Sequence, residues 1–288
     1  MFKEAVLYKT LEGGNIQCFL CAHRCFIKIG QLGKCKVRLN QGGNLFTLNY
    51  GKLIAKHVDP IEKKPLFHFF PGSVSYSIAS PGCNFTCAWC QNWEISQYMQ
   101  FHAEINGQIT DPDRIVAEAE KYQCKSISYT YTEPTVFFEY TYDVSLLAKH
   151  KEIKNIYVTN GYMSAEMINL YAPLLDAANV DIKGFSEKVY QKYIGGHLLP
   201  VLEACKKLKQ KGIWLEITTL VIPNLNDNIQ EIKSLAAFIY DELGSDTPWH
   251  ISRYYPNYQI ENIEPTPMAT LKKLYEIGKT AGLEYVYL

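Results

Sequence analysis

The feature that most constrains the fold is a regular alternation of strand-like and helix-like segments, which begins near residue 74 and continues to residue 288. The strand-like segments are rich in β-branched and aromatic residues, whereas the helix-like segments carry apolar residues at spacings of three and four. The expected strands cover residues 73–80, 126–132, 155–160, 179–184, 214–222, 248–255 and 283–288. The expected helices cover residues 111–123, 136–150, 164–175, a stretch in two pieces that ends with 201–212, 226–243 and 266–282. This order predicts a parallel sheet with helical crossovers.

Six or seven strand–helix units without a Gly-rich dinucleotide turn favour a partial barrel over a doubly wound sheet. We therefore predict an α/β fold with a partial (β/α)6-type TIM-like barrel. The first 70 residues differ in composition, since they are rich in Gly and Cys and contain only short strand-like pieces. The expected domains are a small Cys-rich, metal-binding N-terminal segment at 1–70 and the barrel at 71–288.

Charge and composition exclude several classes of function. The chain carries 29 Lys and Arg residues against 29 Asp and Glu residues, so its formal net charge is zero. This balance gives no general attraction to nucleic acid or anionic membranes, and no stretch is apolar enough for a membrane span. Because the N-terminal stretch also lacks the pattern of a signal peptide, we expect a cytoplasmic protein. In that reducing compartment, nine clustered cysteines indicate metal binding rather than disulfides.

Three cysteines, Cys83, Cys87 and Cys90, follow the first expected barrel strand in the spacing C-x3-C-x2-C. A 4Fe–4S cluster has four irons, each of which takes one ligand, so three thiolates leave one iron open for a substrate or cofactor. No fourth cysteine follows nearby, because the next one, Cys124, falls in an expected helix. The loop therefore predicts a catalytic cluster. Three aromatic side chains are expected to wrap it, namely Phe85, Trp89 and Trp93.

Polar residues fall at the ends of the later strands, where a parallel barrel collects its functional groups. They include Glu133, Asn160, Gly161, Asp181, Lys183, His250 and Arg253. Taken singly, each residue has an ordinary structural explanation, such as a turn or a surface ion pair. Their joint placement predicts one site at the carboxyl ends of the strands.

The cysteine spacing after the first barrel strand resembles that of the radical S-adenosylmethionine (SAM) superfamily. The series of polar motifs at the strand ends resembles that of the branch of the pyruvate formate-lyase activating enzymes. It is most similar to the AmmeMemoRadiSam-system radical SAM enzymes in three motifs at residues 59–73, 82–97 and 131–135. Members of that group continue past the final strand with a further cysteine-containing segment, so the resemblance implies a shorter variant or a partial chain.

The resemblance implies roles for residues on the second and third barrel strands. Glu133 matches the acidic residue of a Gly-Gly-Glu motif that holds the SAM amino group, with Tyr131 and Thr132 in place of the two glycines. Asn160 and Gly161 match a Thr-Asn-Gly turn near the ribose and methionine parts of SAM.

Roles on the later strands follow in the same way. Asp181 and Lys183 match an Asp-x-Lys element whose lysine pairs with the SAM carboxylate. Val221 and Ile222 match a strand whose backbone faces the adenine, and His250 matches a ribose contact.

The resemblance implies a radical SAM oxidoreductase that reductively cleaves SAM to a 5′-deoxyadenosyl radical and abstracts a hydrogen atom from its substrate. A glycyl residue of a partner protein and a small metabolite or cofactor are the two substrate hypotheses. The electron donor is expected to be a low-potential protein such as flavodoxin or ferredoxin. An iron–sulfur electron carrier or metal-binding scaffold is the alternative from another class, but it leaves the polar strand ends unexplained.

A second cysteine set lies in the N-terminal segment and comprises Cys18, Cys21, Cys25 and Cys35. Four thiols make a complete ligand set for zinc or for a second iron–sulfur cluster, and the spacing does not separate the two. Basic neighbours, among them His23, are expected to offset the thiolate charge. The remaining cysteines, Cys124 and Cys205, are expected to be core residues in helices. The charged segment at residues 59–66 is either a solvated loop or a border of the substrate mouth.

Overall fold

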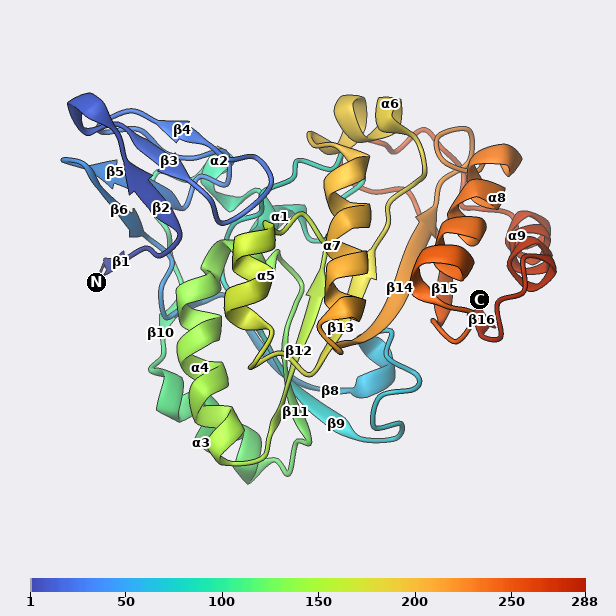
Figure 1. Cartoon of the computed structure of the whole chain (residues 1–288), viewed down its shortest axis with the longest axis horizontal. Coiled ribbons are helices and arrows are strands. Elements are labelled where there is room, and N and C mark those ends of the chain that lie inside the picture. The colour runs from blue at the N-terminus through green and yellow to red at the C-terminus, as the bar shows by residue number, and fades with distance from the viewer. Residues whose placement is uncertain (1) are drawn as a thin grey trace.

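The computed structural model describes residues 2–288 and shows an α/β fold around one large sheet (Figure 1). Its eight strands follow the order β16-β15-β14-β13-β12-β11-β9-β8. They are β8 (Ala55–Pro60), β9 (Val74–Ala79), β11 (Ser126–Tyr129), β12 (Lys154–Thr159), β13 (Ala177–Asp181), β14 (Trp214–Val221), β15 (Trp249–Arg253) and β16 (Val286–Tyr287). Only β8 is antiparallel to its neighbour, and the other seven strands pair in parallel. The predicted partial barrel is therefore confirmed.

Helices connect the parallel strands and cover the outer face of the sheet (Figure 1). They are α1 (Trp93–Ser96), α2 (Tyr98–Phe101), α3 (Pro112–Lys121), α4 (Phe138–His150), α5 (Ala165–Tyr171), α6 (Glu187–Val189), α7 (Leu198–Gln210), α8 (Ile229–Phe238) and α9 (Met268–Thr280). Two of these helices begin with residues that commonly start helices. Pro112 is the first residue of α3, and the Ser164 hydroxyl accepts a hydrogen bond from the Met167 N–H at 3.0 Å at the start of α5.

Two helix ends differ from the prediction for reasons that are visible in the backbone. Helix α3 ends at Lys121 because Gln123 adopts a φ of 54°, so Cys124 lies in the turn before β11 and not in a helix. Cys124 is nonetheless buried, as is Cys205 within α7. Helix α8 gives way at Ile239 to a π-helical turn that ends before Gly244. The expected packing role of both cysteines therefore fits their burial.

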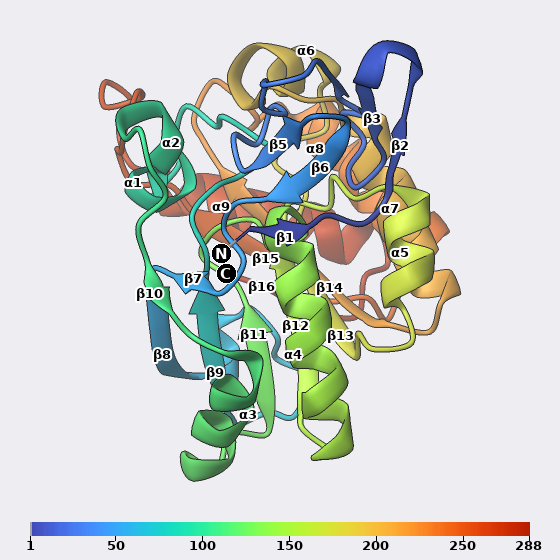
Figure 2. The same cartoon turned by 90° about the vertical axis from the view of Figure 1, so that its left-hand side faces the viewer.

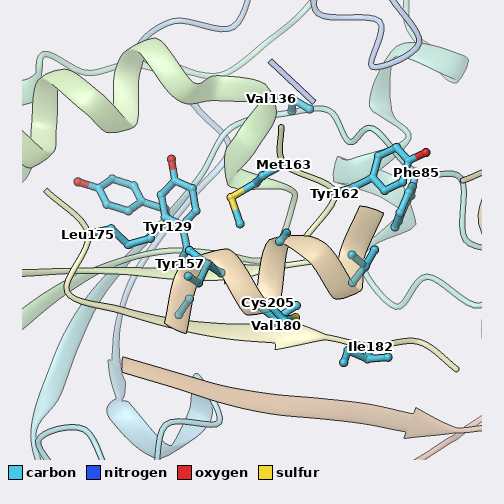
Figure 3. Packing of buried hydrophobic residues seen from close by; sticks show 14 of the residues in the cluster. Phe85, Tyr129, Val136, Tyr157, Tyr162, Met163, Leu175, Val180, Ile182 and Cys205 are labelled. Carbon is cyan, nitrogen blue, oxygen red and sulfur yellow. The ribbon is translucent and has the colours of Figure 1, made fainter. Parts of the chain in front are cut away.

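A core of apolar and tyrosine side chains fills the space between the sheet and its helices (Figure 3). Tyr129 and Tyr157 project from β11 and β12 and are fully buried. Their hydroxyl groups find partners on α4, since Tyr129 pairs with Ser145 at 2.9 Å and Tyr157 with Thr141 at 2.5 Å. Because a buried hydroxyl is costly without a partner, these bonds fix how the sheet and α4 pack together.

The N-terminal residues form small antiparallel sheets in the orders β1-β6-β5 and β2-β3-β4, and β7 pairs with β10. Their strands are β1 (Lys3–Glu4), β2 (Tyr8–Thr10), β3 (Ile16–Cys18), β4 (Phe26–Ile27), β5 (Arg38–Gln41), β6 (Asn44–Thr47), β7 (Lys52–Leu53) and β10 (Gln108–Ile109). The two three-stranded sheets lie over the first turns of α4 and α5 (Figures 1 and 2). The division of the chain near residue 70 stays a prediction, and β8, which precedes it, is the edge strand of the large sheet.

A buried ion pair joins the N-terminal segment to the barrel. Arg38 on β5 and Glu139 on α4 are in direct contact, and both side chains are almost completely buried. Glu139 also accepts the Val6 N–H at 2.8 Å, while Arg38 donates to the Val6 carbonyl at 3.1 Å. A buried ion pair needs such additional partners to offset the loss of hydration. This buried polar contact therefore forms only when the N-terminal segment packs against the barrel.

The face of the large sheet opposite the helices is polar. Tyr76 on β9 contacts Glu118 on α3, so the alternate residues Ser75 and Ser77 face the interior of the partial barrel. In register with them, β13 and β14 place Asp181 and Thr218 on the same inner face. The barrel interior is thus lined with hydroxyl and charged groups rather than with a uniformly apolar core.

Candidate functional site

A cavity of about 460 Å³ opens at the carboxyl ends of the parallel strands. Seven of the predicted site residues line it: Cys83, Cys87, Cys90, Glu133, Asn160, Asp181 and Lys183. These residues come from three separate strand ends and the cysteine loop, and Cys83 and Asn160 alone lie 77 positions apart in the sequence. The expectation that the strand ends converge on one site therefore agrees with the geometry.

Backbone hydrogen bonds and a glycine hold the loop that carries the three cysteines in place. The Thr86 N–H donates to the Ile194 carbonyl at 2.9 Å, and the Ala88 N–H donates to the Tyr193 carbonyl at 2.9 Å. Gly82 adopts a φ of +114°, and a Cβ atom there would lie 2.8 Å from Val37 of the N-terminal segment. Both the backbone conformation and this close approach require glycine.

The three thiols lie in a setting that suits an iron–sulfur cluster. Burial raises the pKa of Cys83 well above its usual range and that of Cys87 to about 12, so a bound cation must supply the charge that keeps them as thiolates. Donors stand beside two sulfurs, since the Phe85 N–H lies 3.4 Å from Cys83 Sγ and the Ser96 hydroxyl lies 3.2 Å from Cys90 Sγ. Hydrogen bonds of this kind tune the potential of a cluster.

Aromatic side chains surround only part of the loop. Phe85 and Trp89 line the cavity and are buried, as expected. Trp93 instead stacks on Tyr258, with ring centroids 5.0 Å apart, and does not line the cavity. The expectation for Trp93 is therefore wrong, because α1 begins at this residue and turns its side chain toward the segment after β15.

Glu133 is held by a set of donors at the end of β11. Its Oε1 accepts the Thr135 N–H at 3.1 Å, the Thr135 hydroxyl at 2.5 Å and the Thr159 hydroxyl at 2.7 Å. Its Oε2 accepts a single hydrogen bond, from the Asn160 N–H at 2.8 Å. Burial raises the pKa of Glu133, and these hydrogen bonds oppose that effect. Oε2 thus keeps capacity for one further donor from within the cavity.

Asn160 links the third strand to the cysteine loop. Its amide donates to the Asn84 side-chain oxygen at 2.7 Å and lies 3.8 Å from Cys83 Sγ. The buried Asn84 Nδ2 has no hydrogen-bond partner within the described part of the chain. Gly161 lies behind the cavity wall, where its φ of +71° and the closeness of Val180 exclude a side chain.

Asp181 and Lys183 form an ion pair of 2.9 Å at the end of β13. Burial by itself lowers the pKa of Lys183, but the charges of Asp181 and Cys87 outweigh it and the net pKa is raised. The lysine is therefore a permanent cation on the cavity wall. A carboxylate ligand is the partner that such a cation favours.

Besides Gly161, three predicted SAM contacts are not in the cavity lining. Val221 and Ile222 are fully buried, and their neighbour Leu220 faces the cavity instead. The Ile222 N–H is already bonded to the Asn226 side chain at 2.6 Å. His250 is 5% exposed and does not line the cavity, and its predicted contact with the ribose stays a prediction.

The His250 ring points to a buried carboxylate that the sequence analysis missed. His250 Nε2 lies 2.7 Å from Oε2 of Glu216, a residue with no exposed surface. Glu216 also accepts the N–H groups of Phe67 at 3.0 Å, His68 at 2.9 Å and Trp214 Nε1 at 3.0 Å. Burial by itself raises the pKa of Glu216, but its donors outweigh burial and the net pKa is lowered. Glu216 thereby fastens the segment after β8 inside the barrel.

Residues 61–70 form the floor of the cavity. Lys63 and Lys64 line it, and neither residue was assigned a role from the sequence. The Pro65 carbonyl accepts a hydrogen bond from Asn179 on β13 at 2.8 Å. Residues 59–66 therefore border the cavity, but at its floor and not at the substrate mouth where the border was predicted.

The four N-terminal cysteines line one small cavity of about 10 Å³. Burial raises the pKa of Cys21 and Cys25 and raises that of Cys35 to about 12, so here too a cation is needed to hold thiolates. Burial lowers the pKa of His23 to about 4, so this residue is neutral and not the charge-offsetting group that was expected. Arg38 takes that place, since its guanidinium lies 3.8 Å from Cys18 Sγ.

Within residues 2–288 no three His, Cys, Asp or Glu side chains stand close enough together to bind a single metal ion. Both cysteine sets are therefore identified by the cavities that they line. No helix in the same part of the chain has the length and apolar character needed to cross a bilayer.

The fold and the three-cysteine cavity agree with the comparisons to known proteins. The chain belongs to the radical SAM superfamily, whose family model matches residues 77–238. Over 286 residues it is 44% identical to the uncharacterized protein MJ0808 of Methanocaldococcus jannaschii, a match that covers 99% of this chain and 84% of that protein.

Solved structures show the same fold. The Streptococcus suis protein SuiB bound to S-adenosylmethionine gives a TM-score of 0.56 at 15% identity, over 72% of this chain and 47% of SuiB. A domain of the pyruvate-formate lyase-activating enzyme from Bacteroides vulgatus gives a TM-score of 0.50 at 14% identity, over 56% of this chain and 96% of that domain. The protein is thus a radical SAM enzyme, with a 4Fe–4S cluster and SAM as its cofactors. The nearer resemblance to the AmmeMemoRadiSam group stays a prediction.

Proposed function

We propose that the cavity at the strand ends is where this enzyme cleaves SAM and abstracts a hydrogen atom from its substrate. The observation that carries the proposal is that three thiols and the polar ends of three strands line one cavity. In this proposal Cys83, Cys87 and Cys90 hold the 4Fe–4S cluster. When bound, the cluster and SAM supply an electron and a 5′-deoxyadenosyl radical that removes the hydrogen atom.

The protein's own contribution is to bind and orient. Glu133 Oε2 accepts a hydrogen bond from the SAM amino group, and Lys183 pairs with the SAM carboxylate. Asn160 holds Asn84 and the Cys83 sulfur in place. Phe85 narrows the approach of water to the thiols. Gly161, Val221 and Ile222 act only through the shape of the backbone behind the wall, and in this proposal His250 bonds to Glu216 rather than to SAM.

A small molecule is the substrate class that the cavity favours. The floor at residues 61–70 closes the barrel below, and side chains with hydrogen-bonding groups line the walls. A glycyl residue of a partner protein, the other hypothesis, requires a peptide loop to enter through the opening at the carboxyl ends of the strands. Hydrogen abstraction from a glycyl-radical protein, with none from small molecules, would support the partner-protein hypothesis instead.

Two features concern electrons and location. Reductive cleavage needs one low-potential electron, so the donor is a protein such as flavodoxin or ferredoxin. We place the protein in the cytoplasm, where reducing conditions keep clustered cysteines available as thiolate ligands.

The second metal centre belongs to the same proposal. Cys18, Cys21, Cys25 and Cys35 hold zinc or a second iron–sulfur cluster, supported by their shared cavity and by burial of the thiols. A triple variant that replaces Cys83, Cys87 and Cys90 by alanine leaves only this site. Iron and zinc counts of that variant, purified without oxygen, separate the two metals. A variant that holds neither contradicts the proposal.

SAM cleavage has a direct test. The full chain is reconstituted anaerobically with iron and sulfide, then reduced with dithionite in the presence of SAM. We expect 5′-deoxyadenosine from the wild type and none from Cys87→Ala. The matched control is Cys124→Ala, which removes a buried cysteine outside both sets. Cleavage by Cys87→Ala at the wild-type rate contradicts the assignment of the cluster.

A further inference from the structure

A buried lysine lies on the floor of the cavity. Lys64 lines the cavity yet is only 1% exposed, and its ammonium group donates to Asp59 Oδ2 at 2.6 Å. Tyr131 lies beside the pair, with its hydroxyl oxygen 3.4 Å from the same ammonium group. An ammonium group is kept in so buried a place only if its three hydrogens find acceptors.

The part of the floor that faces the cavity carries more ammonium than carboxylate groups. Asp59 is shared by two lysines, because Lys63 also donates to its Oδ1 at 2.8 Å. The other carboxylates of the floor, Glu62 and Glu216, do not line the cavity and accept N–H donors of their own. The wall near the cysteines instead combines Glu133 with the neutral Asp181–Lys183 pair, so it is negative before the cofactors bind. The two ends of the cavity therefore suit groups of opposite charge.

The strained backbone at Tyr131 places its hydroxyl group beside the Lys64–Asp59 pair. Tyr131 has a φ of 65°, a conformation that bulky residues rarely adopt and that costs about 1 to 3 kcal/mol. Two contacts hold it there: its carbonyl accepts from Asn92 Nδ2 at 2.9 Å, and its hydroxyl donates to Asp59. Strain of this kind persists where the surrounding structure holds a side chain in a required position.

An unpaired hydroxyl on the wall gives independent evidence for a polar ligand. Thr218 lines the cavity and is 7% exposed, and its Oγ1 has no hydrogen-bond partner among residues 2–288. A buried hydroxyl without a partner is costly, so its hydrogen bond is made to a molecule that enters the cavity.

We propose that the Lys64 floor is a binding site for an anionic group, a carboxylate or a phosphate, of the small-molecule substrate. Lys64 contacts the anion, Asp59 and Tyr131 position the lysine, and Thr218 bonds to an uncharged polar group of the same molecule. The inference rests on the proposed function only in that the substrate occupies this cavity.

The test measures anion binding by the reconstituted enzyme with SAM present. The probes are acetate, pyruvate and inorganic phosphate, with acetamide as the neutral counterpart of acetate, followed by calorimetry and ligand-observed NMR. We expect at least one anion to bind and acetamide not to bind. We expect Lys64→Met to weaken the anion about tenfold to a hundredfold, the usual loss for a hydrogen bond to a charged group. Lys211→Met, an exposed lysine after α7, is the matched control and is expected to bind like the wild type.

Further variants keep the proposal open to refutation if Lys64→Met does not fold. Asp59→Asn/Lys64→Met leaves no uncompensated buried charge, and Tyr131→Phe removes only the hydroxyl; we expect the double variant to lose anion binding and Tyr131→Phe to weaken it. Binding of acetamide as tightly as acetate, undiminished binding by the double variant, or no anion binding by the wild type overturns the inference. Formation of 5′-deoxyadenosine from SAM is measured in parallel. Its absence in the wild type refutes the proposed function, whereas its presence in Lys64→Met without anion binding separates the two claims.

Discussion

Replacing Glu133 by glutamine tests the central hydrogen-bond network of the cavity. The carboxylate accepts three donors at Oε1 and one at Oε2, all from buried groups. A glutamine amide has one acceptor and one donor end, so in its better orientation the NH2 group faces the Asn160 N–H. One buried N–H then loses its partner, and the other three bonds lose their charge assistance. Together these losses amount to about 2 to 4 kcal/mol of folding free energy.

The loss of folding free energy in Glu133→Gln is measurable in the apo protein by thermal and denaturant unfolding. For a chain of this length, that loss lowers the melting temperature by about 3 to 7 °C. Glu94→Gln, an exposed position in α1, is the control and is expected to melt with the wild type. An unchanged melting temperature in Glu133→Gln would refute the network as described. In the reconstituted enzyme we also expect a loss of about tenfold or more in kcat/KM for SAM cleavage, since the acceptor for the amino group is gone.

Three further predictions concern groups behind the cavity. Because the folded-state pKa of Glu216 is lowered, its carboxylate stabilises the fold above an unfolded value of about 4.3, and this contribution is lost as the pH falls further. Denaturant unfolding measured between about pH 5 and about pH 2 should show a steeper fall in the free energy of unfolding for the wild type than for Glu216→Gln, and parallel curves would contradict this. Glu139→Ala leaves Arg38 charged, buried and unpaired and should cost about 3 to 5 kcal/mol in urea unfolding, whereas Arg38→Met/Glu139→Leu should cost much less; equal costs would count against the buried pair. His250→Gln should leave the KM for SAM unchanged, because the ring faces Glu216, and a large rise in KM would support the predicted ribose contact.

The sequence predicted the fold well because its signals are local. Strand and helix periods, the Ser164 cap and Pro112 at a first helical position are set by residues within a few positions of one another. The helix ends near Gln123 and Ile239 were not predicted, because a positive φ and a π-helical turn have no periodic signature in the sequence. Cys124 was therefore placed in a helix that ends before it.

The cysteine loop and the polar strand ends were also determined by the sequence. Parallel strands bring their carboxyl ends to one edge, so Glu133, Asn160 and Asp181 had to meet near Cys83 once the parallel sheet was accepted. The spacing of three thiols within eight positions is likewise a local property. For these residues, sequence order and sheet topology together leave little freedom.

Only the tertiary structure decided which neighbours complete the cavity. His250 was assigned to SAM, yet pairing with β14 sets it beside Glu216, because register decides which groups a strand residue meets. The Lys64–Asp59 pair is joined to Tyr131 across more than 65 positions, and this contact exists only because residues 61–70 fold back under the sheet. Long-range packing, which no local pattern encodes, thus decides the chemistry of the floor.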